Sequence, residues 1–276
     1  MLGRVLSQAA REGTLCLPGV AWPIERADQA VIESTQFSCA EITTSTLRIL
    51  NWNIAKNNHQ PDWLADVTQI LSQVNLDLVF LQEVHLDCRQ VPSLPFVNMG
   101  WHFAPNFMAT NSQYFGILTA SKAQHCSRRS LLTQHYEPIV QTPKVSLITE
   151  YPLAGERQTF LAVNIHAINF VSLSKFRAQL HQLEAALTHH VGPLLLSGDF
   201  NTWSRYRLRL LKAMAERLGL THLQFEPAHR QQLKHFWVHP LDHIFYRGLA
   251  ALQTEVWGHV TSSDHAPMIA EFELHT

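Results

Sequence analysis

From Leu47 to the C-terminus, short apolar runs bounded by polar residues alternate with stretches of helical periodicity. This alternation is the feature that most constrains the fold. The runs suit strands and are shorter than the roughly 18 consecutive apolar residues that cross a bilayer. Several runs follow one another without an intervening helical stretch, which favours antiparallel or mixed sheets over an all-parallel sheet. The pattern therefore predicts a layered α/β domain.

The predicted strands have apolar centres and polar boundaries. They cover residues 47–54, 77–83, 115–120, 144–151, 159–166, 194–199, 241–246, 253–257 and 267–274.

Three helices are predicted from apolar residues spaced three or four apart. The first begins at Pro61, with an inward face made of Leu64, Val67, Leu71 and Val74. The second is capped by Ser172 or Ser174 and stops before Gly192. The third is capped by Ser204 and stops before Gly219.

Residues 1–45 have no sustained period, so we treat them as an N-terminal extension ahead of one domain over residues 46–276. The first 25 residues interrupt every apolar stretch with charge, Gly or Pro, unlike a secretory signal. The four cysteines form no C-x-x-C pair, which favours reduced thiols. We therefore expect a soluble, cytoplasmic protein with no membrane span. The sequence does not indicate its oligomeric state.

Several apolar runs end in residues that bind metals or phosphates, including Asn53, Glu83, His166 and Asp199. One such ending is ordinary, because Asp and Asn often form the turn after a strand. Their recurrence favours a common site. Side chains at i and i+2 of a strand point the same way, so Asn51 with Asn53, Asn164 with His166, and Asp199 with Asn201 are predicted to face one cleft.

The segment LLLSGDFN places Asp199 at the mouth of a buried strand. Partial desolvation there and a neighbouring amide can tune a carboxylate for proton transfer. The alternative is an Asx turn that only ends the strand. On these residues alone, both interpretations stand.

Glu83 closes the run DLVFLQE. A carboxylate in this position is costly unless it is paired or bound to a metal. A salt bridge is the ordinary explanation. Carboxylate and amide oxygens with water also make the shell that Mg²⁺ or Mn²⁺ prefers, and Mg²⁺ often takes only one or two protein carboxylates.

Near the C-terminus, Asp264 and His265 follow Asp242 by about twenty residues. An Asp against an imidazole fixes its tautomer and stabilises its charged form, as in hydrolytic dyads. A buried histidine satisfied by one hydrogen bond is the alternative. The sequence has no G-x-S-x-G elbow and no glycine-rich phosphate loop, which removes support for serine catalysis and for nucleotide-binding folds.

The series LNWNI, VFLQE, FGILTAS, VNIHAIN, LSGDFNTW, LDHIFYRG and SSDHAPM resembles the endonuclease/exonuclease/phosphatase superfamily, the DNase I-like phosphoesterases. The motifs arrive in the family's order and span roughly Leu47 to Leu274. Within the superfamily, VNIHAINF, GDFNTWSR and LDHIFYRG resemble the bacterial YafD-like branch. The resemblance implies a four-layer α/β sandwich of two mixed β-sheets flanked by helices, and divalent-metal-dependent phosphoester hydrolysis.

The resemblance also implies roles for individual residues. Asn53 and Glu83 would lie at the metal, with Asp264 close enough to assist. His166 would contact the phosphate, and Asn201 would hold a phosphoryl oxygen or orient Asp199. The attacking water would be positioned or deprotonated by Asp199, while Asp242 and His265 would form the dyad. Family members differ on whether Asp or His is the base.

Two departures from the family's pattern limit what the resemblance implies: the long basic or aromatic DNA-binding insertions of abasic-site nucleases are not evident, and the residues after the first Asn differ. Several nucleases of the superfamily have an acidic residue or glycine shortly after the first Asn, where this chain has Ala55 and Lys56. Lys56 is a possible phosphate contact, and a solvated strand-end lysine is the alternative. Arg205, Arg209 and Lys212 recur on one face of the third helix and either guide a phosphate chain or form a solvated face.

Three classes of function follow from these residues. A phosphodiesterase or nuclease is the first, because a basic helix borders the site. A phosphatase or phosphodiesterase of a small or lipid phosphoester is the second, since the net charge of −1 leaves no global basic field. A catalytically silent binding module is the third, and a zinc hydrolase lacks the HExxH pattern it would need.

Overall fold

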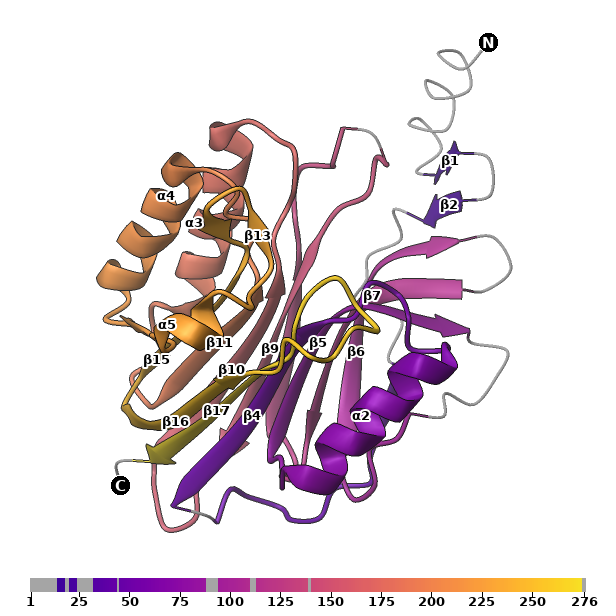
Figure 1. The fold of residues 1–276 in the computed structure, drawn as a ribbon. Helices are drawn as coiled ribbons and strands as arrows, with labels where there is room; N and C mark the ends of the chain where they lie inside the picture. Colours follow the sequence, from indigo (N-terminus) through magenta and orange to yellow (C-terminus); the bar gives the residue numbers. More distant parts are fainter. Residues whose placement is uncertain are drawn as a thin grey trace.

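A computed structural model describes residues 14–17, 20–23, 32–43, 45–87, 94–109, 113–138 and 140–274. Two large sheets form the body of the protein (Figure 1). In the described ranges, no helix is both long enough and apolar enough to cross a membrane.

The seven-stranded sheet has the order β16-β17-β4-β5-β7-β6-β3. Its strands, in that order, are Leu249–Val256, Met268–Leu274, Thr46–Asn53, Leu78–Asp87, Gln113–Ser121, Gly100–Ala109 and Ile32–Ser34. Only the central pair β4 and β5 is parallel, and the other neighbours are antiparallel. The sheet is therefore mixed, as the sequence predicts.

The six-stranded sheet has the order β12-β15-β11-β10-β9-β8. Its strands, in that order, are Thr221–His222, Asp242–Arg247, Leu194–Asp199, Thr159–His166, Val145–Pro152 and Ser127–Leu132. Here β10 and β11 are parallel, and the other pairs are antiparallel. Two further hairpins pair Thr14–Leu17 (β1) with Val20–Pro23 (β2), and His235–Phe236 (β13) with His239–Pro240 (β14).

The helices are α2 (Pro61–Gln73), α3 (Leu173–Leu187), α4 (Arg205–Arg217) and the short α5 (Pro227–Arg230). Helix α2 packs on the outer face of the large sheet, while α3 and α4 pack on the outer face of the small one. A third apolar cluster lies between the sheets, where Ile49 and Phe80 meet Phe160 and Leu195. The predicted four-layer α/β sandwich is confirmed.

The predicted helix ends are close to those observed, but the buried face of α2 is rotated. Its buried residues are Trp63, Val67 and Ile70, whereas Leu64 is 37% exposed. The indole of Trp63 stacks on Trp52 of β4 at 6.1 Å between ring centroids. An aromatic ring buries more area than a leucine side chain, so the tryptophan sets which face turns inward.

Strands β3, β6 and β8 lie outside the predicted set. Strand β8 reads SRRSLL and runs along an exposed edge, so it has no apolar run, and β6 contains Gly, Pro and Asn. Strand β3 pairs with β6, so the large sheet begins inside the segment that the sequence placed in an extension. Strands β3 and β8 are edge strands with partly buried or exposed side chains, and β6 is interrupted by Pro105 and Asn106, so none of the three shows a sustained apolar run.

Candidate active site

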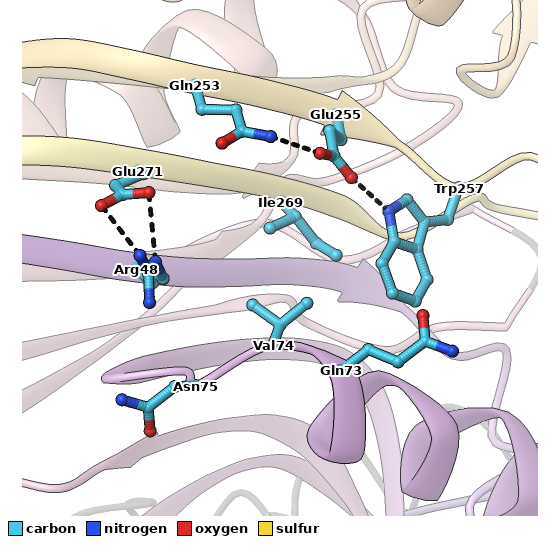
Figure 2. Close-up of a pocket in the computed structure, with 9 residues that line it drawn as sticks. All are labelled: Arg48, Gln73, Val74, Asn75, Gln253, Glu255, Trp257, Ile269 and Glu271. Atoms are coloured by element: carbon cyan, nitrogen blue, oxygen red, sulfur yellow. Dashed lines mark hydrogen bonds and ion pairs between the residues drawn. The ribbon is translucent and has the colours of Figure 1, made fainter.

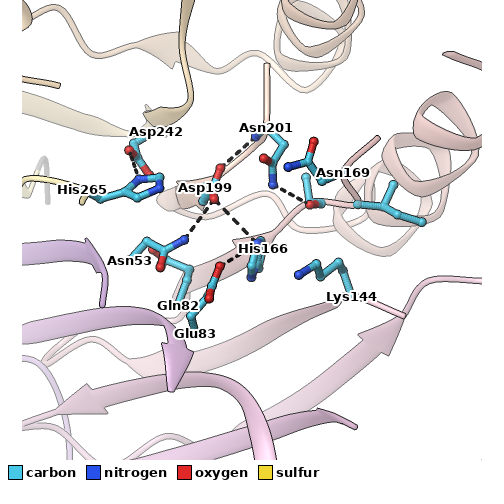
Figure 3. A network of polar contacts seen from close by, with 12 residues as sticks. Asn53, Gln82, Glu83, Lys144, His166, Asn169, Asp199, Asn201, Asp242 and His265 are labelled. Carbon is cyan, nitrogen blue, oxygen red and sulfur yellow. Dashed lines mark hydrogen bonds and ion pairs between the residues drawn. The ribbon is translucent and has the colours of Figure 1, made fainter. Parts of the chain in front are cut away.

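Three neighbouring strands of the small sheet end in site residues that share one register. His166 of β10 lies beside Asp199 of β11, which lies beside Asp242 of β15. Gly198 permits this close pairing, because a Cβ on it would lie 1.9 Å from the carbonyl oxygen of Ile165. Figure 3 shows the resulting row of side chains. The regular spacing of a sheet therefore brings together residues that are far apart in sequence.

The large sheet contributes Asn53, the last residue of β4, and Glu83, which lies in the middle of β5 and not at its end, where the sequence predicts it. Glu83 lies at a bulge in β5 and has a left-handed backbone, with φ of 55°. Ala55 and Lys56 also have positive φ, at 49° and 65°. Left-handed non-glycine residues are strained and cluster at functional sites. The bulge re-aims the Glu83 carboxylate toward the small sheet.

The two sheets meet at the site through an amide. The Asn53 Nδ2 atom donates to Asp199 Oδ2 at 3.0 Å, and its Oδ1 accepts from the backbone of Ala55. Beneath this contact, Gln82 Nε2 donates to Asn51 and to Asn164. Asn51 and Asn164 thus join the sheets below the site and do not line it, which differs from the sequence prediction.

Asp199 ends its strand, and its buried side chain also faces the site; proton transfer by this residue stays a prediction. Its Oδ1 accepts from the backbone N–H of Asn201 at 2.9 Å, which is an Asx turn. Asn201 has φ of 51°, and its amide Nδ2 donates to the carbonyl of Ala167 at 2.9 Å. One of its amide hydrogens therefore fixes the neighbouring loop.

Asp242 and His265 form the predicted dyad. The imidazole Nδ1 of His265 lies 2.7 Å from Asp242 Oδ2, and both side chains are buried. Trp52 Nε1 donates to the backbone carbonyl of His265 at 2.8 Å and holds that residue from below. The dyad stands next to Asp199, since ligand atoms of the three residues lie within 4.8 Å of one another.

Burial and the neighbouring Asp242 raise the pKa of Asp199 to about 7. Burial alone would lower the pKa of His265, but Asp242 and then Asp199 raise it to about 10. At neutral pH the site thus holds an imidazolium and a carboxyl that exchanges its proton near pH 7. A general base works best when its pKa is close to the operating pH.

Burial would raise the pKa of Glu83, but positive charge on His166 when that imidazole is protonated, and on Lys56 and Lys144, lowers it to about 2. Burial lowers the pKa of His166 well below its usual value, so the imidazole is neutral at neutral pH. Lys56, which forms an ion pair with Glu83 Oε2, is then the main cation that keeps Glu83 ionised. Glu83 Oε1 lies 3.9 Å from His166 Nε2, too far for a hydrogen bond.

The structure does not bring two of the predicted site residues into this group. Asp264 is exposed and forms an ion pair with Lys234 at 2.8 Å. Arg205 lies at the start of α4, and its guanidinium contacts the Tyr206 ring and hydroxyl. Asp264 lies in the loop before β17, and Arg205 is the first residue of α4, so neither of them ends a strand at the site.

Sequence reasoning missed Lys144, which points toward His166 and Glu83 (Figure 3). Its ammonium lies 3.5 Å from Glu137 Oε2. Asn169 was also missed, and its Oδ1 accepts from Trp203 Nε1 at 3.0 Å. Lys144 immediately precedes β9, so it does not end an apolar run and carries no signal of the kind that singles out His166 or Asp199.

Behind the site, a chain of hydrogen bonds joins the Asn201 loop to the surface. Thr202 Oγ1 donates to the Pro240 carbonyl at 2.6 Å and lies 2.7 Å from His243 Nε2. His243 Nδ1 lies 3.0 Å from His222 Nε2, and Gln224 Nε2 lies 3.1 Å from His222 Nδ1. Donors and acceptors alternate only if both imidazoles are neutral.

The chain of hydrogen bonds through His243 and His222 predicts that the protein loses stability in acid. Burial, with a smaller effect of Lys212, lowers the pKa of His222 to about 4. The unfolded state then binds the proton more readily than the folded state does. The contribution of neutral His222 to the free energy of unfolding is therefore complete above about pH 6.5 and is lost as the pH falls toward 4. The free energy of unfolding, measured with urea, should fall between pH 7 and pH 5 in wild type. In His222→Gln this fall should be smaller by about 1–2 kcal/mol. His189→Gln, at an exposed position, is the control and should show the same pH dependence as wild type. An unfolding free energy of His222→Gln that changes with pH as in wild type would contradict the role given to His222.

A separate pocket of about 360 Å³ lies at the other end of β4 (Figure 2). Its polar side chains already pair with one another. Arg48 pairs with Glu271, and Glu255 accepts from Gln253 and from Trp257. It shares no residue with the group around Asp199, where the convergent charges lie.

The family model described as Endonuclease/Exonuclease/phosphatase family matches residues 50–265, and the chain belongs to this family. The match includes every residue of the group in Figure 3. Membership supports phosphoester hydrolysis as the general activity, and enzymes of the family generally use a divalent metal.

Within the family, the chain is similar to bacterial UPF0294 proteins, which agrees with the predicted YafD-like branch. It is 34% identical to one from Erwinia tasmaniensis over 236 residues, which covers 84% of this chain and 83% of the relative. It is 33% identical to one from Vibrio vulnificus over 253 residues, which covers 87% and 84%.

Solved structures show the same fold at low identity. An endonuclease/exonuclease/phosphatase from Beutenbergia cavernae gives a TM-score of 0.62 at 17% identity, with 84% of this chain and 72% of the other covered. The catalytic domain of human Nocturnin with bound sulfate gives 0.64 at 17% identity, with 89% and 98% covered.

Proposed function

We propose that this protein is a divalent-metal-dependent phosphodiesterase or nuclease that hydrolyses its substrate with an activated water. The observation that carries the proposal is the pairing of two proton-transfer groups in one buried site. Asp199 is poised near pH 7, and His265 beside it is protonated at neutral pH. Hydrolysis of a phosphoester requires a base for water and positive charge for the phosphoryl oxygens.

The residues divide these tasks. Asp199 accepts a proton from the attacking water, held in place by Asn53 and the Asn201 backbone. His265 is oriented by Asp242 and donates a proton to the leaving oxygen. His166 is neutral and donates a hydrogen bond to a phosphoryl oxygen. Lys144 and Lys56 contribute positive charge at the same opening.

Glu83 and Asn53 fit a hard divalent cation such as Mg²⁺ or Mn²⁺. The Glu83 carboxylate is ionised, and within the described part of the chain its Oε1 has no hydrogen-bond partner, since His166 Nε2 lies 3.9 Å away. A protonated His265 offers no lone pair, so the cluster of Asp199, Asp242 and His265 suits proton transfer better than ligation. When bound, the cation would neutralise charge on the phosphoryl oxygens. Asp264 is committed to Lys234 and is not part of this proposal.

We propose Mg²⁺-dependent turnover that fails in Glu83→Gln. The substitution removes the charged oxygen but keeps the shape, so kcat should fall by about two decades or more while the fold is retained. The assay measures hydrolysis of a chromogenic diester, single-stranded DNA, duplex DNA, RNA and inositol phosphates, with Mg²⁺, with Mn²⁺ and with EDTA.

Glu255→Gln is the matched control, because Glu255 lines the distant pocket of Figure 2. It should keep wild-type turnover. Turnover by Glu83→Gln within a few-fold of wild type, or equal rates in EDTA, would reject the proposal. Hydrolysis confined to phosphomonoesters or lipid phosphoesters would favour the second class of substrate, and no hydrolysis with intact folding would favour a silent binding module.

A further inference from the structure

Three aromatic residues form a row that begins at the site and ends in solvent. Trp203 follows the Asp199–Asn201 turn and is hydrogen-bonded to Asn169. The ring of Phe236 meets it edge to face at 6.4 Å between centroids, and Trp237 lies nearly parallel to Phe236 at 6.1 Å with an interplanar angle of 9°. We call Trp203, Phe236 and Trp237 the aromatic row.

The outer end of the row is displayed on a strained turn. Trp237 and Val238 connect β13 to β14, and they are 90% and 78% exposed. Trp237 has φ of 58°. Two-residue hairpin turns with positive φ favour Asn, Asp or Gly, and a bulky side chain there is strained. A tryptophan at this position breaks the local rule while exposing a large ring, which points to a function for the ring.

A second exposed ring, that of Phe170, is linked to the start of the row through Asn169. Phe170 is 59% exposed and also has a left-handed backbone, with φ of 51°. Its backbone N–H donates to Asn169 Oδ1 at 2.9 Å, the same oxygen that accepts from Trp203. Asn169 therefore fixes Phe170 and the start of the row together, on the side of the site where His166 ends its strand.

Positive charge accompanies these rings. The guanidinium of Arg205 lies 4.9 Å from the centre of the half-exposed Tyr206 ring. Both residues follow Trp203 within three positions of the sequence. Arg209 and Lys212 continue along the same shallow groove on α4. Lys234 precedes the hairpin, but its charge is paired with Asp264, so Arg205, Arg209 and Lys212 carry the positive charge of this face. Rings with basic side chains around them suit a ligand that has both flat apolar faces and negative charge.

We propose that the aromatic row stacks unpaired bases of a single-stranded nucleic acid next to the phosphate that is cleaved. This inference rests on the proposed function and names its substrate class. Bases stack on aromatic side chains with little sequence preference. A bilayer would engage only the hairpin tip, whereas this row starts at a hydrogen-bonded tryptophan in the site. Bases in a duplex already stack on each other, so the row gives duplex DNA no comparable gain.

Binding of labelled oligothymidine in EDTA, measured by fluorescence anisotropy, tests the row without hydrolysis. Trp237→Asn removes the outer ring and suits the left-handed backbone, so the fold should be retained. We expect about fivefold or greater weakening of single-strand binding, from the loss of one stacked base. Binding of an abasic strand of equal length should not change, because it has the same phosphates and no bases.

Val191→Asn is the control, since Val191 is 80% exposed but lies beyond the far end of α3. It should bind like wild type. Unchanged single-strand affinity in Trp237→Asn overturns the inference, as does weakened binding to anionic phospholipid vesicles with oligothymidine binding intact. Base-dependent binding without hydrolysis of any diester would support the row and reject only the proposed function.

Discussion

Replacing Asp199 with asparagine is expected to remove turnover and to stabilise the fold. Loss of the general base should lower kcat about 10²–10⁴-fold. The folded carboxyl has a pKa raised from 3.8 to about 7 by burial and Asp242, so its contribution to stability is present below pH 3.8 and is lost as the pH rises through 7. Above that pH the ionised group costs roughly 4 kcal/mol.

The neutral amide recovers most of this cost. It gives up the hydrogen bond from Asn53, worth about 1 kcal/mol. We therefore expect the free energy of unfolding to rise by about 1–3 kcal/mol at pH 8 in EDTA, measured by urea titration. Asp264→Asn, at an exposed carboxylate, should change neither stability nor turnover much. A less stable Asp199→Asn protein would show that Asp199 is held by attraction and would exclude it as a poised base.

The convergence of the site could be predicted from the sequence, because its residues end strands. His166, Asp199 and Asp242 end or begin apolar runs, and the sheet register then brings them together. The cross-sheet contact of Asn53 with Asp199 could not be derived in this way. It depends on how two sheets face each other, and nothing in the local sequence reports that geometry.

The errors of the sequence-based prediction lie in segments that have no regular alternation of apolar and polar residues. The hairpin of β13 and β14 has two residues in each strand, too few for alternation to show. Lys144 and Trp203 lie outside apolar runs, and their positions depend on loops. Asp264 sits beside His265 in an irregular loop before β17, where strand alternation does not report which of the two side chains faces the site.

The second large effect concerns His265 and depends on the leaving group. As an imidazolium with a pKa raised to about 10 by Asp242 and Asp199 against the effect of burial, His265 can donate a proton but not accept one. We expect His265→Ala to lower kcat by about two decades or more for a sugar or alkyl leaving group, which must be protonated. For a nitrophenyl ester, whose leaving group departs as an anion, the loss should be much smaller.

Loss of the base and loss of the acid therefore depend differently on the leaving group, and one pair of variants tells them apart. Asp199→Asn should slow both esters about equally, since each needs an activated water, whereas His265→Ala should separate them. Asp242→Asn serves as the matched control, because it keeps the imidazole but removes the carboxylate that holds its proton. Its kcat for the alkyl ester should be intermediate between those of wild type and His265→Ala. Equal losses on both esters in His265→Ala would assign the water to His265 and leave Asp199 as a positioning residue.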